Sequence, residues 1–205
     1  FVCNPNNPTG TYWERERLLR FLDRVAGQRI VVVDEAYCEF VEAEDFPDGM
    51  NLIDAYPNLV IFRTFSKMYG LAGLRIGYLA GHLDVVNAIR RTCIVYSVNT
   101  LAQLAAEAAV NDDAHIERTR NLVRESKAFL REDLQRMGLP FVAGEGNYLM
   151  IQLAMSDTLA YRKLMAQGLM IRAMTGFRFP NWIRVSLTRL DVMEAFAAAL
   201  RTLVR

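Results

Sequence analysis

Two short apolar runs without polar alternation constrain the fold of this chain most strongly. Residues 30–33 (IVVV) and 59–62 (LVIF) contain only apolar side chains, and polar residues follow each run. Strands covered on both faces lose the alternation of apolar and polar residues, and such strands are typical of parallel sheets. A helical signal at residues 14–26 precedes the first run, and a connector at 47–57 with a short helical piece lies between the two runs. Strands that alternate with helices predict an α/β fold with a mostly parallel sheet and right-handed crossovers.

Local signals complete the expected first half of the chain. The pattern at residues 11–14 (TYWE) predicts a capping box before the first helix. A further strand is expected at residues 75–80, followed by a helix at 82–91. The Ala-rich helix expected at 101–110 has almost no polar face, so we expect other parts of the protein to cover it.

The composition changes after a long helix expected over residues 111–137, where apolar residues recur every seven positions. Beyond it, short strands and helices predict a small α+β unit. We therefore expect three parts: residues 1–112 as part of a large domain, 113–137 as a connecting helix, and 138–205 as a small C-terminal domain. A helix of this length can bridge two domains.

Charge and composition point away from some classes of partner. The formal net charge of the 205 residues is +1, so nothing favours nucleic acid or an anionic membrane. No stretch approaches the roughly 20 apolar residues that a membrane span needs. Three scattered cysteines fit a reducing, cytoplasmic location better than a disulfide framework. The start at Phe1, without Met, resembles the interior of a strand, so we expect a fragment of a longer protein.

Polar residues follow three successive strands of the expected sheet: Asn7, Asp34 and Lys67. Ligands of open α/β sheets bind beyond the carboxyl ends of the strands, where these residues would meet. A lysine amine can form an imine with an aldehyde, and nearby hydroxyls and an arginine can hold a phosphate. The segment Thr64 to Arg75 offers all of these groups, which suits pyridoxal 5'-phosphate (PLP).

Less specific interpretations of the same residues stay open. A lysine after a strand is most often a solvated loop residue, and an acid there is usually a helix N-cap. No helix signal follows Asp34, because residues 38–41 look extended, so a cationic ligand is a better partner for its carboxylate. Arg172 and Arg184 lie in apolar strands, where they could pair with internal acids or bind substrate carboxylate or phosphate. His82 and His115 are interpreted as surface or structural residues.

Four motifs in order resemble the class I/II aminotransferases of PLP fold type I. They are Asn7-Pro8-Thr9-Gly10, Asp34-Glu35-Ala36-Tyr37, Thr64-Phe65-Ser66-Lys67 with Arg75, and Trp182-Ile183-Arg184-Val185-Ser186. The run Asn6 to Thr11 and the placing of Arg172 before Gly176-Phe177 and Arg184 resemble the histidinol-phosphate aminotransferase branch. The resemblance covers the whole chain, and the four motifs together are highly specific.

The resemblance implies a role for each matching residue. Lys67 is similar to the catalytic lysine that binds the cofactor, and Asp34 to the partner of its pyridine nitrogen. Asn7 and Tyr37 match the family's hydrogen-bond donors to the phenolic oxygen of the cofactor. The phosphate set is Thr64, Ser66 and Arg75, and the substrate set is Arg184, Arg172 and Asn147. No metal is implied, and the family's active sites imply a homodimer.

The sequence also departs from the family pattern. The family's large domain begins well upstream of Phe1, and Arg178 is bulky where this branch usually has a small residue. The leading hypothesis is transamination of histidinol phosphate with 2-oxoglutarate, or of a related amino acid. A threonine-phosphate-type PLP decarboxylase and a non-catalytic effector domain of a transcription regulator are the alternatives.

Overall fold

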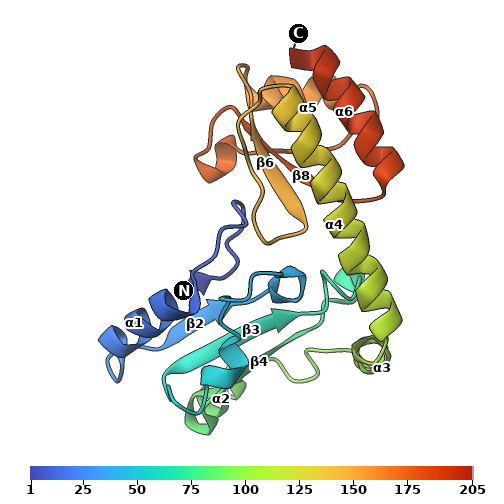
Figure 1. The fold of residues 1–205 in the computed structure, drawn as a ribbon. Coiled ribbons are helices and arrows are strands. Elements are labelled where there is room, and N and C mark those ends of the chain that lie inside the picture. The colour runs from blue at the N-terminus through green and yellow to red at the C-terminus, as the bar shows by residue number, and fades with distance from the viewer. Residues whose placement is uncertain (205) are drawn as a thin grey trace. The chain divides into compact units, whose positions relative to one another are not determined.

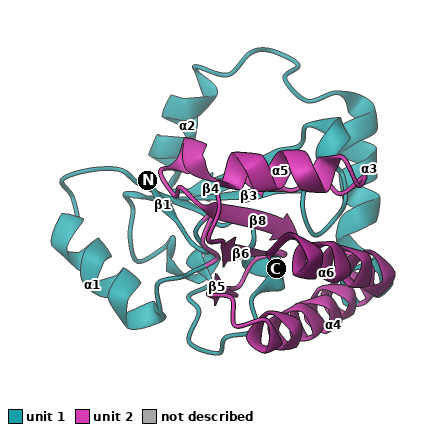
Figure 2. Ribbon diagram, turned by 90° about the horizontal axis from the view of Figure 1, so that it is seen from above, with its two compact units in different colours: residues 1–6, 11–117 teal, residues 7–10, 118–205 magenta. Residues whose placement is uncertain are grey.

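The computed structural model describes residues 1–204, and the chain forms two compact units. Unit 1 comprises Phe1–Asn6 and Thr11–Glu117, and unit 2 comprises Asn7–Gly10 together with the chain from Arg118 onward (Figure 2). The division falls within the long helix α4 (Asp113–Arg136), which is labelled in Figure 1. Each unit has its own four-stranded sheet.

The sheet of unit 1 is mixed, with the strand order β1-β2-β3-β4. Its strands are β1 (Val2–Cys3), β2 (Val31–Asp34), β3 (Leu59–Thr64) and β4 (Gly77–Gly81). The first three are parallel, as expected, and β4 is antiparallel to β3. The connection from β3 to β4 contains only the short helix η3 (Ala72–Leu74). This connection lacks the α-helix that parallel crossovers usually contain, which fits the antiparallel return of β4.

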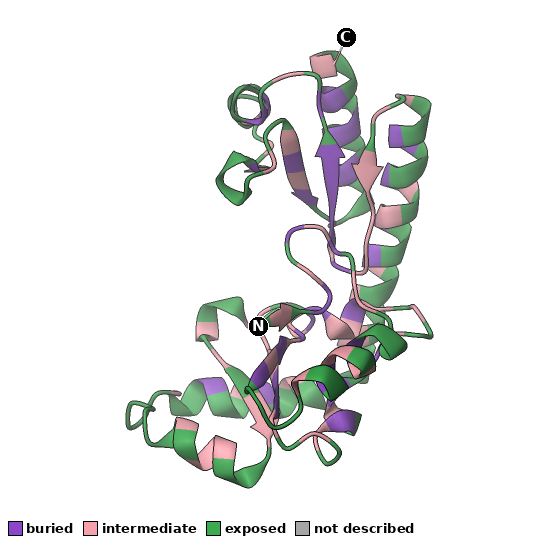
Figure 3. Cartoon of the chain, turned by 90° about the vertical axis from the view of Figure 1, so that its left-hand side faces the viewer, coloured by how far each residue is buried: buried purple, intermediate pink, exposed green. Residues whose placement is uncertain are grey.

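Buried residues of this sheet belong to the core of unit 1, and Figure 3 marks buried positions in purple. Helix α1 (Arg15–Val25) buries Leu18 and Leu22 in the same cluster as sheet residues and η2 (Gly49–Leu52). The remaining buried members of that cluster are Val31, Val33, Leu52, Leu59 and Ile61. The capping-box prediction is wrong, because Glu14 is the N-cap and makes no side-chain cap bond. Instead, the backbone carbonyl of Asp45 accepts the N–H of Arg15 at 2.8 Å.

Helices α2 (Leu83–Arg90) and α3 (Thr100–Val110) follow β4. Within α3 only Ala102 and Ala106 are buried, and the side chain of Leu101 is 73% exposed. The expectation that this helix is covered is therefore wrong for the part of the chain that the structure describes. The segment before α3 is also exposed and apolar, with Ile94, Val95 and Tyr96 among the exposed large hydrophobic residues.

Unit 2 contains an antiparallel sheet with the order β5-β6-β8-β7. Its strands are β5 (Phe141–Val142), β6 (Tyr148–Gln152), β7 (Arg172–Ala173) and β8 (Trp182–Ser186). Its helices are most of α4, α5 (Asp157–Met165), η4 (Thr175–Phe177) and α6 (Leu190–Val204). Strands β6 and β8 and the inner sides of α4, α5 and α6 supply most of its buried apolar residues. No helix among residues 1–204 is long and apolar enough to cross a membrane.

Candidate active site

A cavity of about 370 Å³ lies at the carboxyl ends of β2 and β3 in unit 1. Its lining consists of Asp34, Ala36, Phe62, Arg63, Thr64, Ser66, Lys67, Ala72 and Arg75. Five of these were expected from the sequence to bind one ligand: Asp34, Thr64, Ser66, Lys67 and Arg75. The structure brings these five together because parallel strands end at the same edge of a sheet.

The loop that carries Ser66 and Lys67 is held by bonds within itself. Thr64 ends β3, and its Oγ1 accepts the backbone N–H of Ser66 at 3.1 Å. The N–H of Leu71 donates to the carbonyl of Phe65 at 2.9 Å, which closes the loop. Gly70 has a φ of +69°, a conformation that glycine adopts without strain and that this tight loop needs.

Arg75 turns back toward this loop. Its backbone adopts the left-handed conformation with φ 54° after η3, so the predicted strand begins two residues later, at Gly77. The guanidinium donates from Nη1 to the carbonyl of Ala72 at 2.7 Å and reaches Ser66 Oγ at 3.5 Å. A hydroxyl and a guanidinium at this separation form a donor pair suited to a phosphate oxygen.

Lys67 presents an exposed amine next to an anchored residue. Its Nζ lies 5.4 Å from the ring centroid of Tyr37, which is itself buried. The following residue, Met68, is fully buried, and its carbonyl lies 3.1 Å from Nε2 of His115. The loop is therefore fixed directly beside the lysine, while the amine itself stays accessible.

Asp34 ends β2 half-buried, and its carboxylate lines the cavity. Oδ1 accepts the backbone N–H of Ala36 at 3.0 Å. The chain then turns into the short helix η1 (Cys38–Phe40), so the expectation that residues 38–41 are extended is wrong. An Asp side chain that bonds the backbone two residues ahead favours such a turn.

Unit 2 contains a second group of the expected residues. The Nη1 of Arg184 donates to Oδ1 of Asn7, and its guanidinium lies 5.0 Å from the ring centroid of Tyr148. Arg172 is the β7 partner of Arg184 in the strand register, and its guanidinium lies 5.5 Å from the ring of Phe177. Neither arginine forms an ion pair with an acid among the described residues, so the open alternative of an internal acid is not observed.

Arg184 is not fully satisfied by the protein. Its Nε is buried and has no hydrogen-bond partner in the described part of the chain. Like charges directly opposite on neighbouring strands repel, and a buried unpaired donor costs free energy. An anion bound at Arg172 and Arg184 would relieve both penalties. Asn147, the remaining expected residue, precedes β6, and its carbonyl accepts the N–H of Leu187 at 2.8 Å.

Sequence reasoning missed residues in both groups. In unit 1, Phe62 and Arg63 line the cavity from β3. In unit 2, the ring of Tyr148 contacts Arg184. The signal for Arg63 was available, since a charged residue two positions after Ile61 falls on a face that is otherwise apolar.

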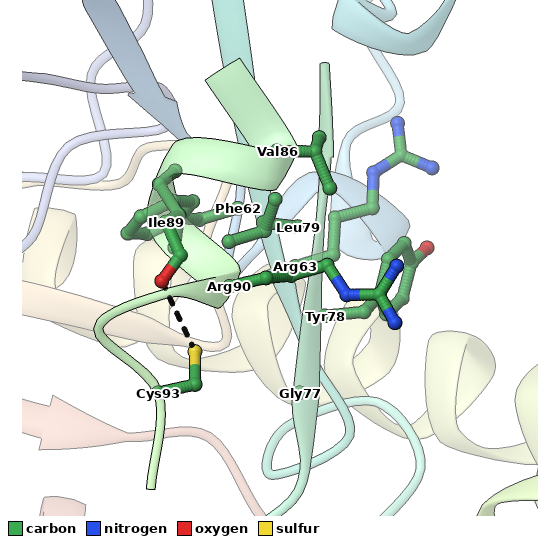
Figure 4. A pocket seen from close by; sticks show the side chains of 9 residues that line it. All are labelled: Phe62, Arg63, Gly77, Tyr78, Leu79, Val86, Ile89, Arg90 and Cys93. Atoms are coloured by element: carbon green, nitrogen blue, oxygen red, sulfur yellow. Dashed lines mark hydrogen bonds between the residues drawn. The ribbon is translucent and has the colours of Figure 1, made fainter. Parts of the chain in front are cut away.

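Phe62 and Arg63 also line a second cavity of about 480 Å³, and Figure 4 shows its side chains from β3, β4, α2 and the turn after α2. That lining is mainly apolar, and Cys93 closes one side with its Sγ 3.5 Å from the carbonyl of Ile89 (Figure 4). It lacks the amine and carboxylate of the first cavity.

Known proteins resemble this chain throughout its length. The family model described as aminotransferase class I and II matches residues 1–200. Histidinol-phosphate aminotransferase 2 of Carboxydothermus hydrogenoformans is 42% identical over 188 residues, which cover 91% of this chain and 52% of that protein. The chain spans about half the length of the curated relatives it matches, 52% and 54% in two examples.

Solved structures give the same picture. Histidinol-phosphate aminotransferase from Sinorhizobium meliloti, in complex with pyridoxal-5'-phosphate, superposes with a TM-score of 0.87 at 29% identity, covering 99% of this chain and 56% of that chain. L-threonine-O-3-phosphate decarboxylase from Porphyromonas gingivalis superposes with a TM-score of 0.86 at 26% identity, covering 98% and 63%. The family match over nearly the whole sequence leads to one conclusion: the chain belongs to the class I and II aminotransferases.

Proposed function

We propose that this protein is a PLP-dependent aminotransferase that transfers the amino group of histidinol phosphate to 2-oxoglutarate. The cavity that gathers Asp34, Ser66, Lys67 and Arg75 in unit 1 is the observation that carries the proposal. The names of the relatives supply the substrate class.

The residues of the cavity fit the cofactor group by group. An accessible amine at Lys67 matches the aldehyde carbon, and the carboxylate of Asp34 matches a protonated pyridine nitrogen. The hydroxyls of Thr64 and Ser66 and the guanidinium of Arg75 match the phosphate. Asn7 and Tyr37 are proposed as donors to the ring oxygen. When bound, PLP supplies the aldehyde that accepts the amino group and a ring that takes up electron density.

The proposed roles of the protein side chains follow from their chemistry. The amine of Lys67 would accept the proton of the substrate carbon and return it. The negative charge of Asp34 would favour the protonated form of a pyridine nitrogen placed beside it. Arg184 is proposed to hold a carboxylate of 2-oxoglutarate and Arg172 the phosphate of histidinol phosphate, which suits their adjacent places on β8 and β7 and the unpaired Nε. Asn147 is proposed to lie near the same substrate.

The proposal also covers the domain boundaries and the oligomeric state. Residues 1–112 correspond to part of the large cofactor-binding domain, residues 113–137 to a connecting helix, and residues 138–205 to the small C-terminal domain of fold type I. We further propose a homodimer in the cytoplasm, as the resemblance to the family implies.

The test is an amino-transfer assay. The protein, loaded with PLP, is given histidinol phosphate and 2-oxoglutarate, and glutamate formation is measured. Glutamate formation that requires both substrates supports the proposal. A protein that binds PLP but forms no glutamate from any amino donor contradicts it.

The decarboxylase is the second candidate, favoured by the likeness to L-threonine-O-3-phosphate decarboxylase. The same protein is given threonine phosphate, and carbon dioxide release is measured. Release of carbon dioxide without consumption of 2-oxoglutarate would favour this candidate over amino transfer.

A further inference from the structure

A buried ion pair lies behind the candidate cofactor cavity. Glu35 is 0% exposed, and its Oε2 accepts bonds from Nε and Nη2 of Arg63 at 3.0 and 2.7 Å. The other oxygen, Oε1, accepts the backbone N–H of Gly49 at 2.8 Å. The Nη2 of Arg63 also donates to Oδ1 of Asp48 at 2.6 Å. Three separate segments of unit 1 therefore meet at one carboxylate.

The pair sits one residue away from the proposed cofactor ligands. Glu35 directly follows Asp34, and Arg63 directly precedes Thr64. The backbone of Glu35 extends the hydrogen-bond ladder between β2 and β3, because its N–H donates to the carbonyl of Phe62 at 2.9 Å. Successive side chains of a strand point to opposite faces, so Asp34 and Thr64 share one face while Glu35 and Arg63 share the other.

There is no spare room around this carboxylate. A Cβ added at Gly49 would lie 2.4 Å from Cδ1 of Ile61 and 2.5 Å from Oε1 of Glu35. The loop that begins at Asp48 is therefore pressed against the ends of both strands. Side chains in such close packing cannot shift without moving their neighbours.

Net stability is a weak explanation for this pair. Removing two charges from water costs about as much as their attraction returns, so apolar residues of similar volume often stabilise a fold as well or better. Burial raises the pKa of Glu35, and the hydrogen bonds and charge of Arg63 oppose that rise. Arg63 lines the cofactor cavity too, but its Nε and Nη2 are directed to carboxylates, which fits a supporting group better than a ligand.

We propose that Glu35 and Arg63 are positioning residues that set the relative placement of Asp34 and the Thr64–Lys67 segment for cofactor binding. The inference rests on the proposed function and extends it to the layer behind the ligands. A planar guanidinium fork with two N–H groups on the single oxygen Oε2 of Glu35 fixes both distance and orientation, which a pair of apolar side chains does not.

Four variants of the protein test the inference. Arg63→Met leaves Glu35 buried without its cation, and the double variant Glu35→Leu with Arg63→Met replaces both charges by apolar groups. Arg63→Lys keeps the charge but not the fork. The matched control is Arg20→Met, which breaks the exposed ion pair with Glu16, where the two side chains are 66% and 83% exposed.

Three quantities are measured: the urea midpoint, the dissociation constant of PLP, and the pH midpoint of the visible absorption band of bound PLP. We expect the double variant to regain most of the stability that Arg63→Met loses. We expect both variants to bind PLP roughly tenfold to a hundredfold more weakly, the range found for groups that orient metal ligands. The absorption midpoint should move in the double variant and in Arg63→Lys, and Arg20→Met should match the unmodified protein.

The outcomes separate the two proposals. A double variant or an Arg63→Lys protein that binds PLP with unchanged affinity and an unchanged absorption midpoint overturns the positioning role. An unmodified protein that binds no PLP overturns the proposed function instead.

Discussion

The two faces of the β2–β3 strand pair give neighbouring charged residues different environments. On the open face, Asp34 lines a cavity with Lys67 and Arg75. On the covered face, Glu35 is fully buried and bonded to Arg63 and the backbone of Gly49. Asp34 and Glu35 are neighbours in sequence, yet their environments suit different roles. Asp34 can contact a ligand in the cavity, whereas Glu35 is placed to stabilise the packing of the strands.

The largest effect is expected on the open face, from Lys67→Ala. The proposed catalytic amine is lost, so amino transfer should fall by roughly 10³-fold or more, the order that one proton-transferring side chain contributes. The urea midpoint should barely move, because the side chain is exposed. Transfer that persists in this variant, measured with histidinol phosphate and 2-oxoglutarate, would remove Lys67 from the proposed mechanism.

The next effect is expected on the covered face, from Arg63→Met. The buried carboxylate of Glu35 loses its cation, which costs about 3–5 kcal/mol of unfolding free energy. The free energy is measured by urea unfolding at neutral pH, with Arg20→Met as the control. A loss as small as that of the control would mean that the two faces do not differ in energy.

The pH dependence of that loss follows from the pKa of Glu35. Burial already raises this pKa, and removing Arg63 removes the groups that oppose the rise. A group whose folded-state pKa lies above its unfolded value contributes its full stability below the unfolded pKa, about 4.3 for Glu. This contribution is lost as the pH rises through the folded-state pKa. The penalty of Arg63→Met should therefore be smallest near pH 4 and grow toward neutral pH; a penalty that is flat with pH argues against Glu35 as its source.

A smaller effect is expected from Gly49→Ala. The new Cβ meets Ile61 Cδ1 at 2.4 Å and Glu35 Oε1 at 2.5 Å, so the loop must shift away from the ion pair. Overpacking of this kind costs about 1–3 kcal/mol. The matched control is Gly73→Ala, because a Cβ there has no heavy atom within 4 Å. Equal urea midpoints for the two variants would contradict the tight packing behind the cavity.

The smallest effect is expected from Arg20→Met. Its ion pair with Glu16 at 3.3 Å is exposed, and exposed pairs of this spacing on a helix contribute about 0.3–0.5 kcal/mol. Urea unfolding in low and high salt measures this contribution directly. A loss of unfolding free energy above about 1.5 kcal/mol would contradict the expected difference between exposed and buried ion pairs.

Part of the fold and of the candidate site was predictable from local patterns. The apolar runs at 30–33 and 59–62 became β2 and β3, paired in parallel. Lys67 and Asp34 could be placed near one another because both follow strands of one parallel sheet. Helix α4 was expected from its seven-residue apolar repeat, within two residues at each end. These predictions rest on short-range periodicity, which a sequence displays directly.

Other features depended on contacts that no local pattern encodes. The capping box at 11–14 did not form: Glu14 is the N-cap without a side-chain cap bond, and the distant carbonyl of Asp45 accepts the N–H of Arg15. Strand β4 pairs antiparallel with β3 after a connection that contains no α-helix. Helix α6 contains the neighbouring apolar residues Val192, which is 38% exposed, and Met193, which is buried. A shift of one residue in a helix start changes which side chains face the core.

The sequence by itself determined the chemical groups of this protein: an amine, a carboxylate, hydroxyls and arginines at strand ends, in an order that matches a family. The tertiary structure alone decided which of these groups share a cavity and which charged neighbours are buried behind it. Glu35 and Arg63 lie 28 positions apart in the chain, and their pairing exists only because β2 and β3 are adjacent and in register. Charge and hydrogen bonding act over a few ångströms in space, whereas sequence patterns report only on neighbours along the chain.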